Sequence, residues 1–151
     1  MPLLRAALSW NFVLATAICA SLLAQLIKVL LNLFIFHRFI AERMWGAGGM
    51  PSSHSATVCA MVVATGRYCG VNSPIFAIAA VLSIIVMYDA MGVRYETGEQ
   101  AKVLNRMFTE WMDQGFEQFQ LPHGKKLKEM VGHTPIEVVT GAALGIVLGF
   151  A

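Results

Sequence analysis

Long apolar stretches separated by short polar segments are the main feature of this chain. Charged residues are absent from positions 6–27, 44–66 and 68–88, which are 22, 23 and 21 residues long. A helix needs about 20 apolar residues to cross the hydrocarbon core of a bilayer. The pattern therefore predicts membrane spans at about 6–27, 52–68 and 73–89.

A fourth apolar stretch runs from position 134 to 151. Its 18 residues make about 27 Å of helix at 1.5 Å per residue, so it is short for a full crossing. The first span is expected to continue as helix beyond Lys28. The second span opens at Pro51 with flanking serines, which is typical of a helix N-terminus because proline has no N–H and serine caps the free ones.

The segment from 95 to 130 is polar enough to leave the bilayer. Within it, large apolar residues and one glycine recur at helical spacing: Leu104, Phe108, Trp111, Gly115 and Phe119. This spacing predicts an amphipathic helix that lies in the membrane interface. A helix that packs against the protein's own spans fits the same spacing.

The composition supports a membrane protein. Hydrophobic residues make up 57% of the chain and charged residues only 13%, whereas a soluble domain carries about 25% charged residues. We therefore expect one integral membrane domain, residues 1–151, that is all-α: a polytopic transmembrane helical bundle of about four spans plus an interfacial amphipathic helix. Nucleic acid is not an expected partner, because the short basic run at 125–128 suits anionic lipid.

The basic residues fall mostly on one side of the predicted membrane. Nine of the eleven Lys and Arg residues lie on the side where the second span begins: Lys28, Arg38, Arg43, Arg94, Lys102, Arg106, Lys125, Lys126 and Lys128. Arg5 and Arg67 lie on the other side. By the positive-inside rule, the side with the excess is cytoplasmic.

Several chemically active residues from different segments share this side. They are Lys28, His54, Asp89, Arg94, His133 and Glu137. Ionisable groups at membrane depth are costly, and they tend to mark functional sites or to pair with one another. We therefore expect a convergent polar site at this face.

The segment GGMPSSHSA, residues 48–56, is a glycine-rich turn that leads into a helix. Backbone N–H groups at Gly49 and the first helical turn, with the hydroxyl groups of Ser52 and Ser53, suit a bound phosphate. His54 would then lie beside the anion as a proton donor. A capped helix with an interfacial histidine explains the same residues.

The segment GHTPIE, residues 132–137, opens the last span. Thr134 and Glu137 fit a capping box, in which each side chain bonds to the backbone of the other. In a functional interpretation, Glu137 instead accepts a ring N–H of His133, which fixes the tautomer and raises the nucleophilicity of that ring. Both interpretations remain open on the sequence.

Two cations complete the expected site. Arg94 lies five residues after Asp89, so the two fit an interfacial ion pair, or Arg94 presents its planar fork to phosphate oxygens. Lys28 is isolated between apolar runs, and it either extends its ammonium group toward water or serves as a second cation at the site.

Taken together, these segments resemble one family. In order they are AQLIKV (24–29), GGMPSSHSA, VMYDAMGVRYETGEQAKVLN (86–105) and KKLKEMVGHTPIEVVTGAALG (125–145). They are similar to the divergent subgroup of the type 2 phosphatidic acid phosphatase superfamily, which is related to acid phosphatases and vanadium-dependent haloperoxidases. The resemblance covers nearly the whole chain.

The resemblance implies a role for each matching residue. His133 would be the nucleophile that forms a phosphohistidine, Glu137 would orient it, and His54 would protonate the leaving group. Lys28 and Arg94 would stabilise the phosphoryl charge, and Asp89 would lie in the same phosphate-binding group as Gly49, Ser52 and Ser53. The implied activity is hydrolysis of a lipid phosphate or pyrophosphate without a metal or other cofactor.

The sequence lacks the arginines of two superfamily motifs. Ile35 and Phe36 stand where the first motif has Arg-Pro, and Leu127 stands where the third motif has its Arg. A second interpretation is therefore a catalytically inactive membrane protein that uses the same pocket to bind anionic headgroups or a partner. The expected partners are membrane lipid and, because the last span is short, a second copy of the chain.

Overall fold

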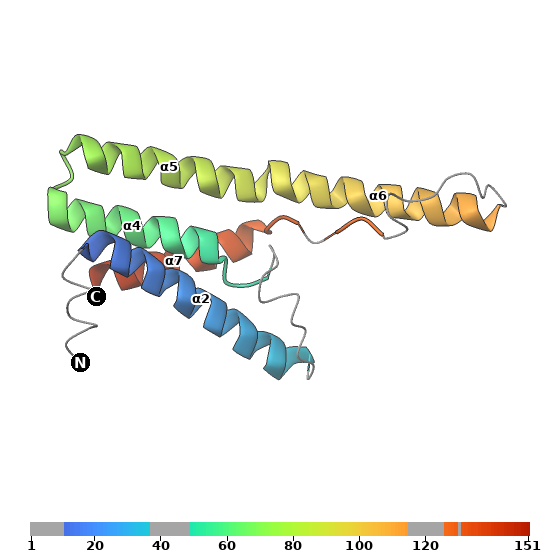
Figure 1. Ribbon diagram of the computed structural model, residues 1–151, viewed down its shortest axis with the longest axis horizontal. Helices are drawn as coiled ribbons and strands as arrows, with labels where there is room; N and C mark the ends of the chain where they lie inside the picture. Colours follow the sequence, from blue (N-terminus) through green and yellow to red (C-terminus); the bar gives the residue numbers. More distant parts are fainter. Residues whose placement is uncertain (1–10, 37–48, 115–125, 130) are drawn as a thin grey trace.

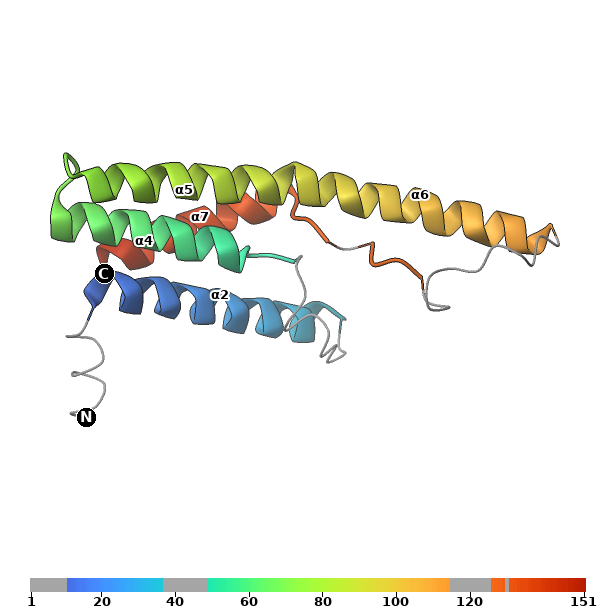
Figure 2. The same ribbon diagram turned by 45° about the horizontal axis from the view of Figure 1, so that its top comes forward.

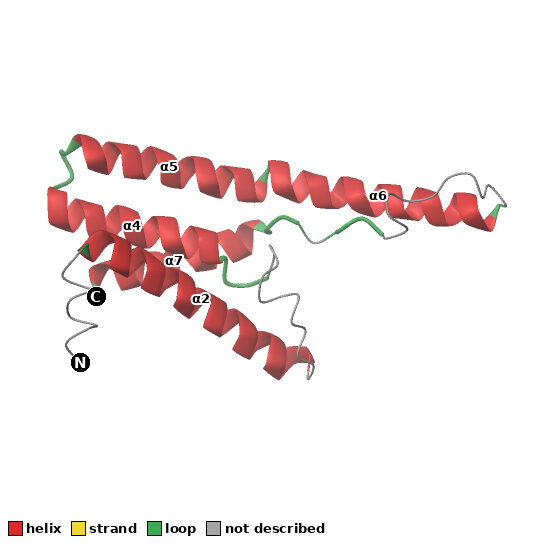
Figure 3. Ribbon diagram, viewed as in Figure 1, coloured by secondary structure: helices red, strands yellow, loops and turns green. Residues whose placement is uncertain are grey.

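The computed structural model describes residues 11–36, 49–114, 126–129 and 131–151. These residues form the helices α2 (Phe12–Phe36), α4 (Ser53–Cys69), α5 (Pro74–Met91), α6 (Val93–Asp113) and α7 (Pro135–Phe150), and they contain no strand. Figure 3 shows helices joined by short loops in this part of the chain. The predicted all-α class is confirmed.

Four of these helices form a bundle, and the fifth extends beyond it. Helices α2 and α5 run in one direction and α4 and α7 in the other, while α6 continues the line of α5 past the end of the bundle (Figures 1 and 2). This up-and-down arrangement brings the beginnings of α4 and α7 to the same end as the end of α5. The site described below lies at that end.

Alanine side chains form the centre of the bundle. Ala20 and Ala24 of α2 pack with Ala56 and Ala60 of α4, and all four are fully buried. Such small side chains let two helix backbones approach closely. The resulting van der Waals contact stabilises helix pairs in lipid, where no hydrophobic driving force acts between them.

The contact between α4 and α7 is closer still. Gly141 and Gly145 of α7 face the backbone of α4, and an added Cβ atom at either position would collide with the carbonyl oxygen of Ser52 or Ala56. At Gly149 an added Cβ atom would meet the side chain of Val63. We call this run of glycines at every fourth position the glycine seam (Gly141, Gly145 and Gly149). The glycine seam sets the separation of α4 and α7.

Two stretches are long and apolar enough to cross a membrane, Phe12–Phe34 and Pro74–Asp113, and α7 is a shorter apolar helix. Helix α4 packs against α2, α5 and α7, so most of its surface faces protein and its serines and threonines do not face lipid. The first predicted span extends to Phe36 as expected, and its residues 6–10 lie outside the described residues. Crossing by α4 and α7 stays a prediction.

Helix α6 corresponds to the predicted interfacial helix. It contains Leu104, Phe108 and Trp111 of the expected stripe, while residues 115 and 119 lie outside the described residues. Among the described helices it contacts only α5, so it does not pack against the rest of the bundle. Its position on a membrane surface stays a prediction.

Candidate functional site

The structure brings together the ionisable residues that the sequence placed on one side. His54 is the second residue of α4, and its ring lies 6.2 Å from the ring of His133, centroid to centroid, at an interplanar angle of 63°. The charges of Lys28 and Arg94 both act on these two rings. Residues from α2, α4, α6 and the start of α7 thus share one electrostatic environment.

His133 is held from two sides. Its backbone N–H donates to the carbonyl oxygen of Ala90 at 3.1 Å, and its Nδ1 lies 3.1 Å from Oε2 of Glu137. The side chain is only 2% exposed. Its Nε2 is buried and has no hydrogen-bond partner among the described residues, which is uncommon for a buried polar atom and needs an explanation.

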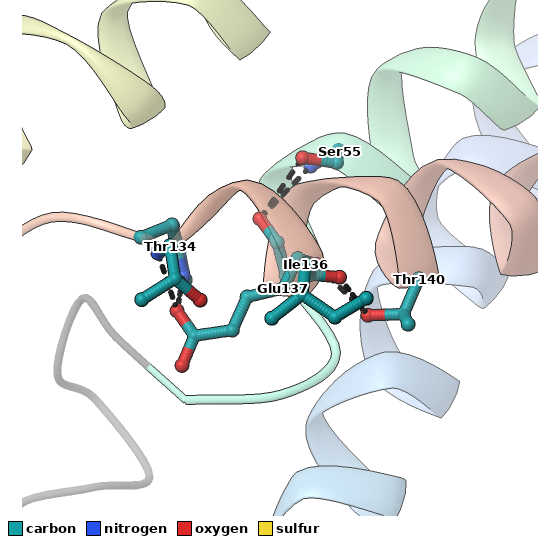
Figure 4. Close-up of polar contacts among 7 residues, drawn as sticks. Ser55, Thr134, Ile136, Glu137 and Thr140 are labelled. Carbon is teal, nitrogen blue, oxygen red and sulfur yellow. Dashed lines mark hydrogen bonds and ion pairs between the residues drawn. The ribbon is translucent and has the colours of Figure 1, made fainter.

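Glu137 satisfies both interpretations that the sequence left open. The capping box with Thr134 is present, and Oε2 of Glu137 accepts the Thr134 N–H at 3.0 Å as well as facing His133. Figure 4 shows the Glu137 side chain turned back toward Thr134 at the start of α7. The cap therefore fixes the carboxylate in the position that orients the imidazole.

The protonation state of His133 follows from this environment. Burial lowers the pKa of His133 below its ordinary value, and the hydrogen bond and charge of Glu137 oppose that shift without cancelling it. The ring is therefore neutral near pH 7. A neutral ring whose Nδ1–H donates a hydrogen bond to the Glu137 carboxylate carries its lone pair on Nε2, which is the state that a nitrogen nucleophile needs.

A pocket of about 320 Å³ lies beside the two histidines. It is lined by His54, Ile85, Val86, Asp89, Ala90, Arg94 and His133. Its volume lies at the lower end of the range for small-molecule sites. The aliphatic residues of α5 form one wall, and the polar groups come from α4, α5, α6 and the segment before α7.

Arg94 is both an ion-pair partner and a pocket residue. Its Nε donates to Oδ2 of Asp89 at 2.6 Å, and the two side chains are 50% and 40% exposed. The bond uses the Nε edge of the guanidinium, so neither terminal nitrogen takes part in it. Arg94 can therefore keep Asp89 and still offer donors to an anion in the pocket.

Lys28 lies behind the pocket rather than in its wall. The residue is 2% exposed, and its aliphatic chain passes 3.4 Å from the position of an added Cβ atom at Gly49, whose φ of +92° suits glycine. The charge of Lys28 interacts with that of Glu137. A buried ammonium group near a carboxylate is the pairing expected of charges at membrane depth.

The predicted phosphate ligands Ser52 and Ser53 are not in the pocket wall. Ser52 is fully buried, and its Oγ accepts the Ser55 N–H at 3.3 Å and the Ser55 hydroxyl at 3.0 Å. Its own N–H donates to the carbonyl oxygen of Glu137 at 3.0 Å. The capped-helix interpretation therefore describes Ser52, which links α4 to α7. Ser53 is buried as well.

Gly49 lines a smaller pocket, of about 130 Å³, which Glu137 also lines. Thr134, Glu99, Lys102 and Glu129 are among the other lining residues. Among the described residues, no group of three or more His, Cys, Asp or Glu side chains could hold a metal ion.

Asn105 was not among the site residues predicted from the sequence, and its side chain holds the segment that leads to His133. Asn105 is 4% exposed, and its side chain makes three hydrogen bonds, all of them to Leu127 and Glu129. The sequence shows only that Asn105 is a polar residue on a helix with both polar and apolar positions, which does not distinguish it from the other polar residues of α6. The partners lie more than 20 residues away, so the spacing along the helix could not reveal them.

Comparisons with known proteins agree with this architecture. Residues 9–148 match the divergent PAP2 family. The chain is 38% identical over 144 residues to "Uncharacterized membrane protein YuiD" of Bacillus subtilis (strain 168), and the alignment covers 91% of each chain. No solved structure matches the chain. The predicted resemblance is confirmed, and the chain is a membrane protein that belongs to the divergent PAP2 family.

Proposed function

We propose that this protein is a membrane phosphatase that hydrolyses a lipid phosphate or pyrophosphate through a phosphohistidine. The observation that carries the proposal is the buried Nε2 of His133, which has no partner among the described residues while Nδ1 is held by Glu137. A histidine that only stabilised the fold would be expected to use both ring nitrogens.

In the first step, the lone pair of His133 Nε2 attacks phosphorus and forms the N–P bond. The bond between phosphorus and the leaving oxygen breaks, and His54, which is protonated once the negatively charged substrate lies beside it, donates a proton to that oxygen. His54 lines the same pocket as His133, and its ring lies 6.2 Å from the His133 ring, centroid to centroid, so both rings are within reach of one bound phosphoryl group. Glu137 stabilises the positive charge that develops on His133.

In the second step, water attacks the phosphorus of the phosphohistidine. His54, now neutral, accepts a proton from that water, the N–P bond breaks, and its electron pair returns to Nε2 of His133. Inorganic phosphate leaves and His54 is protonated again for the next cycle.

Charge at the phosphoryl group is balanced by two cations. Arg94 lines the pocket and keeps its terminal nitrogens available, and Lys28 acts from behind Glu137. The apolar wall at Ile85 and Val86 suits the first carbons of a lipid chain. This arrangement supports an amphiphilic substrate.

A second candidate function is binding of anionic headgroups without catalysis. It is favoured by one observation: Arg94 is the only guanidinium among the residues that line the larger pocket, and it is paired with Asp89. Lys126 and Lys128, the other basic residues near His133 in the chain, line neither described pocket. Residue 125 lies outside the described residues.

The test is phosphate release by purified protein in lipid nanodiscs. Substrates would be phosphatidic acid and isoprenyl pyrophosphates, with excess EDTA present because no metal is required. We expect release by the wild type and background rates for His133→Ala and His54→Ala. Folded wild-type protein that releases no phosphate from any substrate, yet binds vesicles containing phosphatidic acid, would replace the phosphatase with the headgroup-binding protein.

A further inference from the structure

The chain that leads to His133 runs alongside α6, in the opposite direction. We call this segment the connector (residues 126–129, 131 and 132). Leu127 contacts Asn105, Glu129 contacts Gly98, and Gly132 contacts Tyr95. Position on α6 therefore falls steadily as position on the connector rises (Figures 1 and 2). Residues 98 to 105 of α6 thus act as a template for the segment.

Asn105 makes the polar part of this contact. Its Nδ2 donates to the carbonyl oxygen of Leu127 at 2.9 Å, and its Oδ1 accepts the Leu127 N–H at 2.8 Å. The same Nδ2 donates to Oε1 of Glu129 at 2.8 Å. One side-chain amide thus satisfies both backbone groups of one residue, as a neighbouring strand would, and fixes the register of the connector.

Two glycines make the close part of the contact. A Cβ atom added to Gly98 would lie 2.5 Å from the carbonyl oxygen of Glu129. One added to Gly132 would collide with the backbone of Tyr95. The connector and α6 therefore touch backbone to backbone at Gly98 and at Gly132. A shift of the connector along the helix would replace both close contacts with collisions or gaps.

The connector ends at the proposed nucleophile. His133 follows Gly132 directly, and its N–H donates to Ala90 at 3.1 Å while its ring faces Glu137. Asn105 lies 15 residues after Ala90 in the chain, which is roughly 22 Å of helix at 1.5 Å per residue. The connector bridges that length and determines where the chain enters the pocket.

We propose that Asn105 is a positioning residue for His133. It acts through the connector: by fixing the register of Leu127 and Glu129 on α6, it keeps Nδ1 of His133 on Glu137 and the ring in the wall of the pocket. The kinetic part of this proposal rests on the proposed phosphatase activity. The structural part, the orientation of the ring, does not.

The test compares Asn105→Ala with Gln100→Ala in lipid nanodiscs. Gln100 is an exposed amide on the same helix, and alanine favours the helix at both positions, so α6 itself is preserved. The ring is observed by NMR of protein labelled with ¹⁵N-histidine, with the signal of His133 assigned by its loss in His133→Gln. We expect wild type and Gln100→Ala to show protonated Nδ1 and bare Nε2, and Asn105→Ala to show a mixture of tautomers.

The kinetic readout is the split between kcat and KM. Asp89 belongs to α5 and Arg94 to α6, and neither lies on the connector. We therefore expect Asn105→Ala to change KM little. A displacement of the nucleophile of about 1 Å would lower kcat on the order of 10²-fold. If the wild type hydrolyses none of the substrates, the proposed function fails, whereas the tautomer still tests the positioning.

A rescue variant separates positioning from a loss of folding. Asn105→Asp puts a second carboxylate against Glu129 and should disturb His133. Adding Glu129→Gln restores a donor to that pair and should recover part of the wild-type tautomer signature and of kcat. The proposal is overturned if Asn105→Ala keeps the wild-type tautomer and kcat. It is overturned equally if no Asn105 variant folds, because the residue is then purely structural.

Discussion

The beginnings of α4 and α7 meet in one site but treat their histidines differently. At the start of α7, His133 is buried, its backbone is fixed on Ala90 and its ring is held by Glu137. At the start of α4, His54 is exposed at the same pocket. A nucleophile benefits from a fixed lone pair, whereas a proton donor must exchange protons with water. The contrast supports the proposed roles of nucleophile for His133 and proton donor for His54.

The largest expected effect comes from the glycine seam, which sets the distance between the two regions. Gly141 contacts the backbone of Ser52, two residues before His54 in the chain. We expect Gly141→Val to separate α4 from α7, to abolish phosphate release and to lower the melting temperature. Ala143→Val, on an exposed position of α7, is the matched control. Overpacking of this kind costs about 1–3 kcal/mol of stability or more. Equal melting temperatures would show that the seam does not set the spacing.

Glu137→Gln tests the clamp on His133. The amide has nearly the same shape but no longer stabilises the developing charge or fixes the tautomer, so we expect kcat to fall about 10²–10⁴-fold. Retention of wild-type kcat would mean that Glu137 serves only as a helix cap.

The pH dependence of Glu137→Gln gives an independent readout. Activity requires neutral His133, so the acid limb of kcat/KM follows the pKa of His133, which burial holds below its usual 6.5. Glu137 raises that pKa, so removing its charge should move the acid limb to still lower pH. A limb that moves upward would contradict the assignment of the limb to His133.

His54→Ala tests the other region through the leaving group. We expect kcat to fall about 10²–10⁴-fold for an alkyl phosphate, whose leaving oxygen needs a proton. The leaving group of p-nitrophenyl phosphate departs as an anion, so the first step should change little on this substrate. Hydrolysis of the phosphohistidine should then limit turnover. Loss of the first step itself on p-nitrophenyl phosphate, seen as the absence of a nitrophenol burst, would point to a structural role for His54.

The smallest expected effect concerns Asp89, which shares the pocket with both histidines. Asp89→Asn keeps an acceptor for Nε of Arg94 and removes the negative charge. Since the pair is about half exposed, the effect should be modest, within about 1 kcal/mol, and KM should fall a few fold because the pocket becomes more positive. A higher KM would mean that the charge of Asp89 is needed to orient Arg94.

Much of the fold followed from the distribution of charge along the chain. Gaps between charged residues indicated the helices, and counting directions along the chain placed His54, Arg94 and His133 at one end, where the structure has them. The capping box at Thr134 was equally visible, because its residues are three positions apart. Local patterns of this kind depend on neighbours in sequence.

Contacts between distant residues could not be inferred in this way. The role of Asn105 depends on Leu127, 22 positions later, and the backbone of Ser52 is tied to Glu137 across two helices. The serines looked like phosphate ligands because a helix N-terminus suits an anion. In the structure, Ser55 and Glu137 engage Ser52 instead, which only tertiary packing determines.

The most direct test of the central claim, that His133 is the nucleophile, is to trap the phosphoenzyme. His54→Ala protein in nanodiscs would be mixed with p-nitrophenyl phosphate, quenched in base, in which phosphohistidine survives, and digested for mass spectrometry. We expect a phosphate on the peptide that contains His133, and none when His133→Gln is added. Turnover by wild-type protein with phosphate on a different residue, or with none on His133, would contradict it.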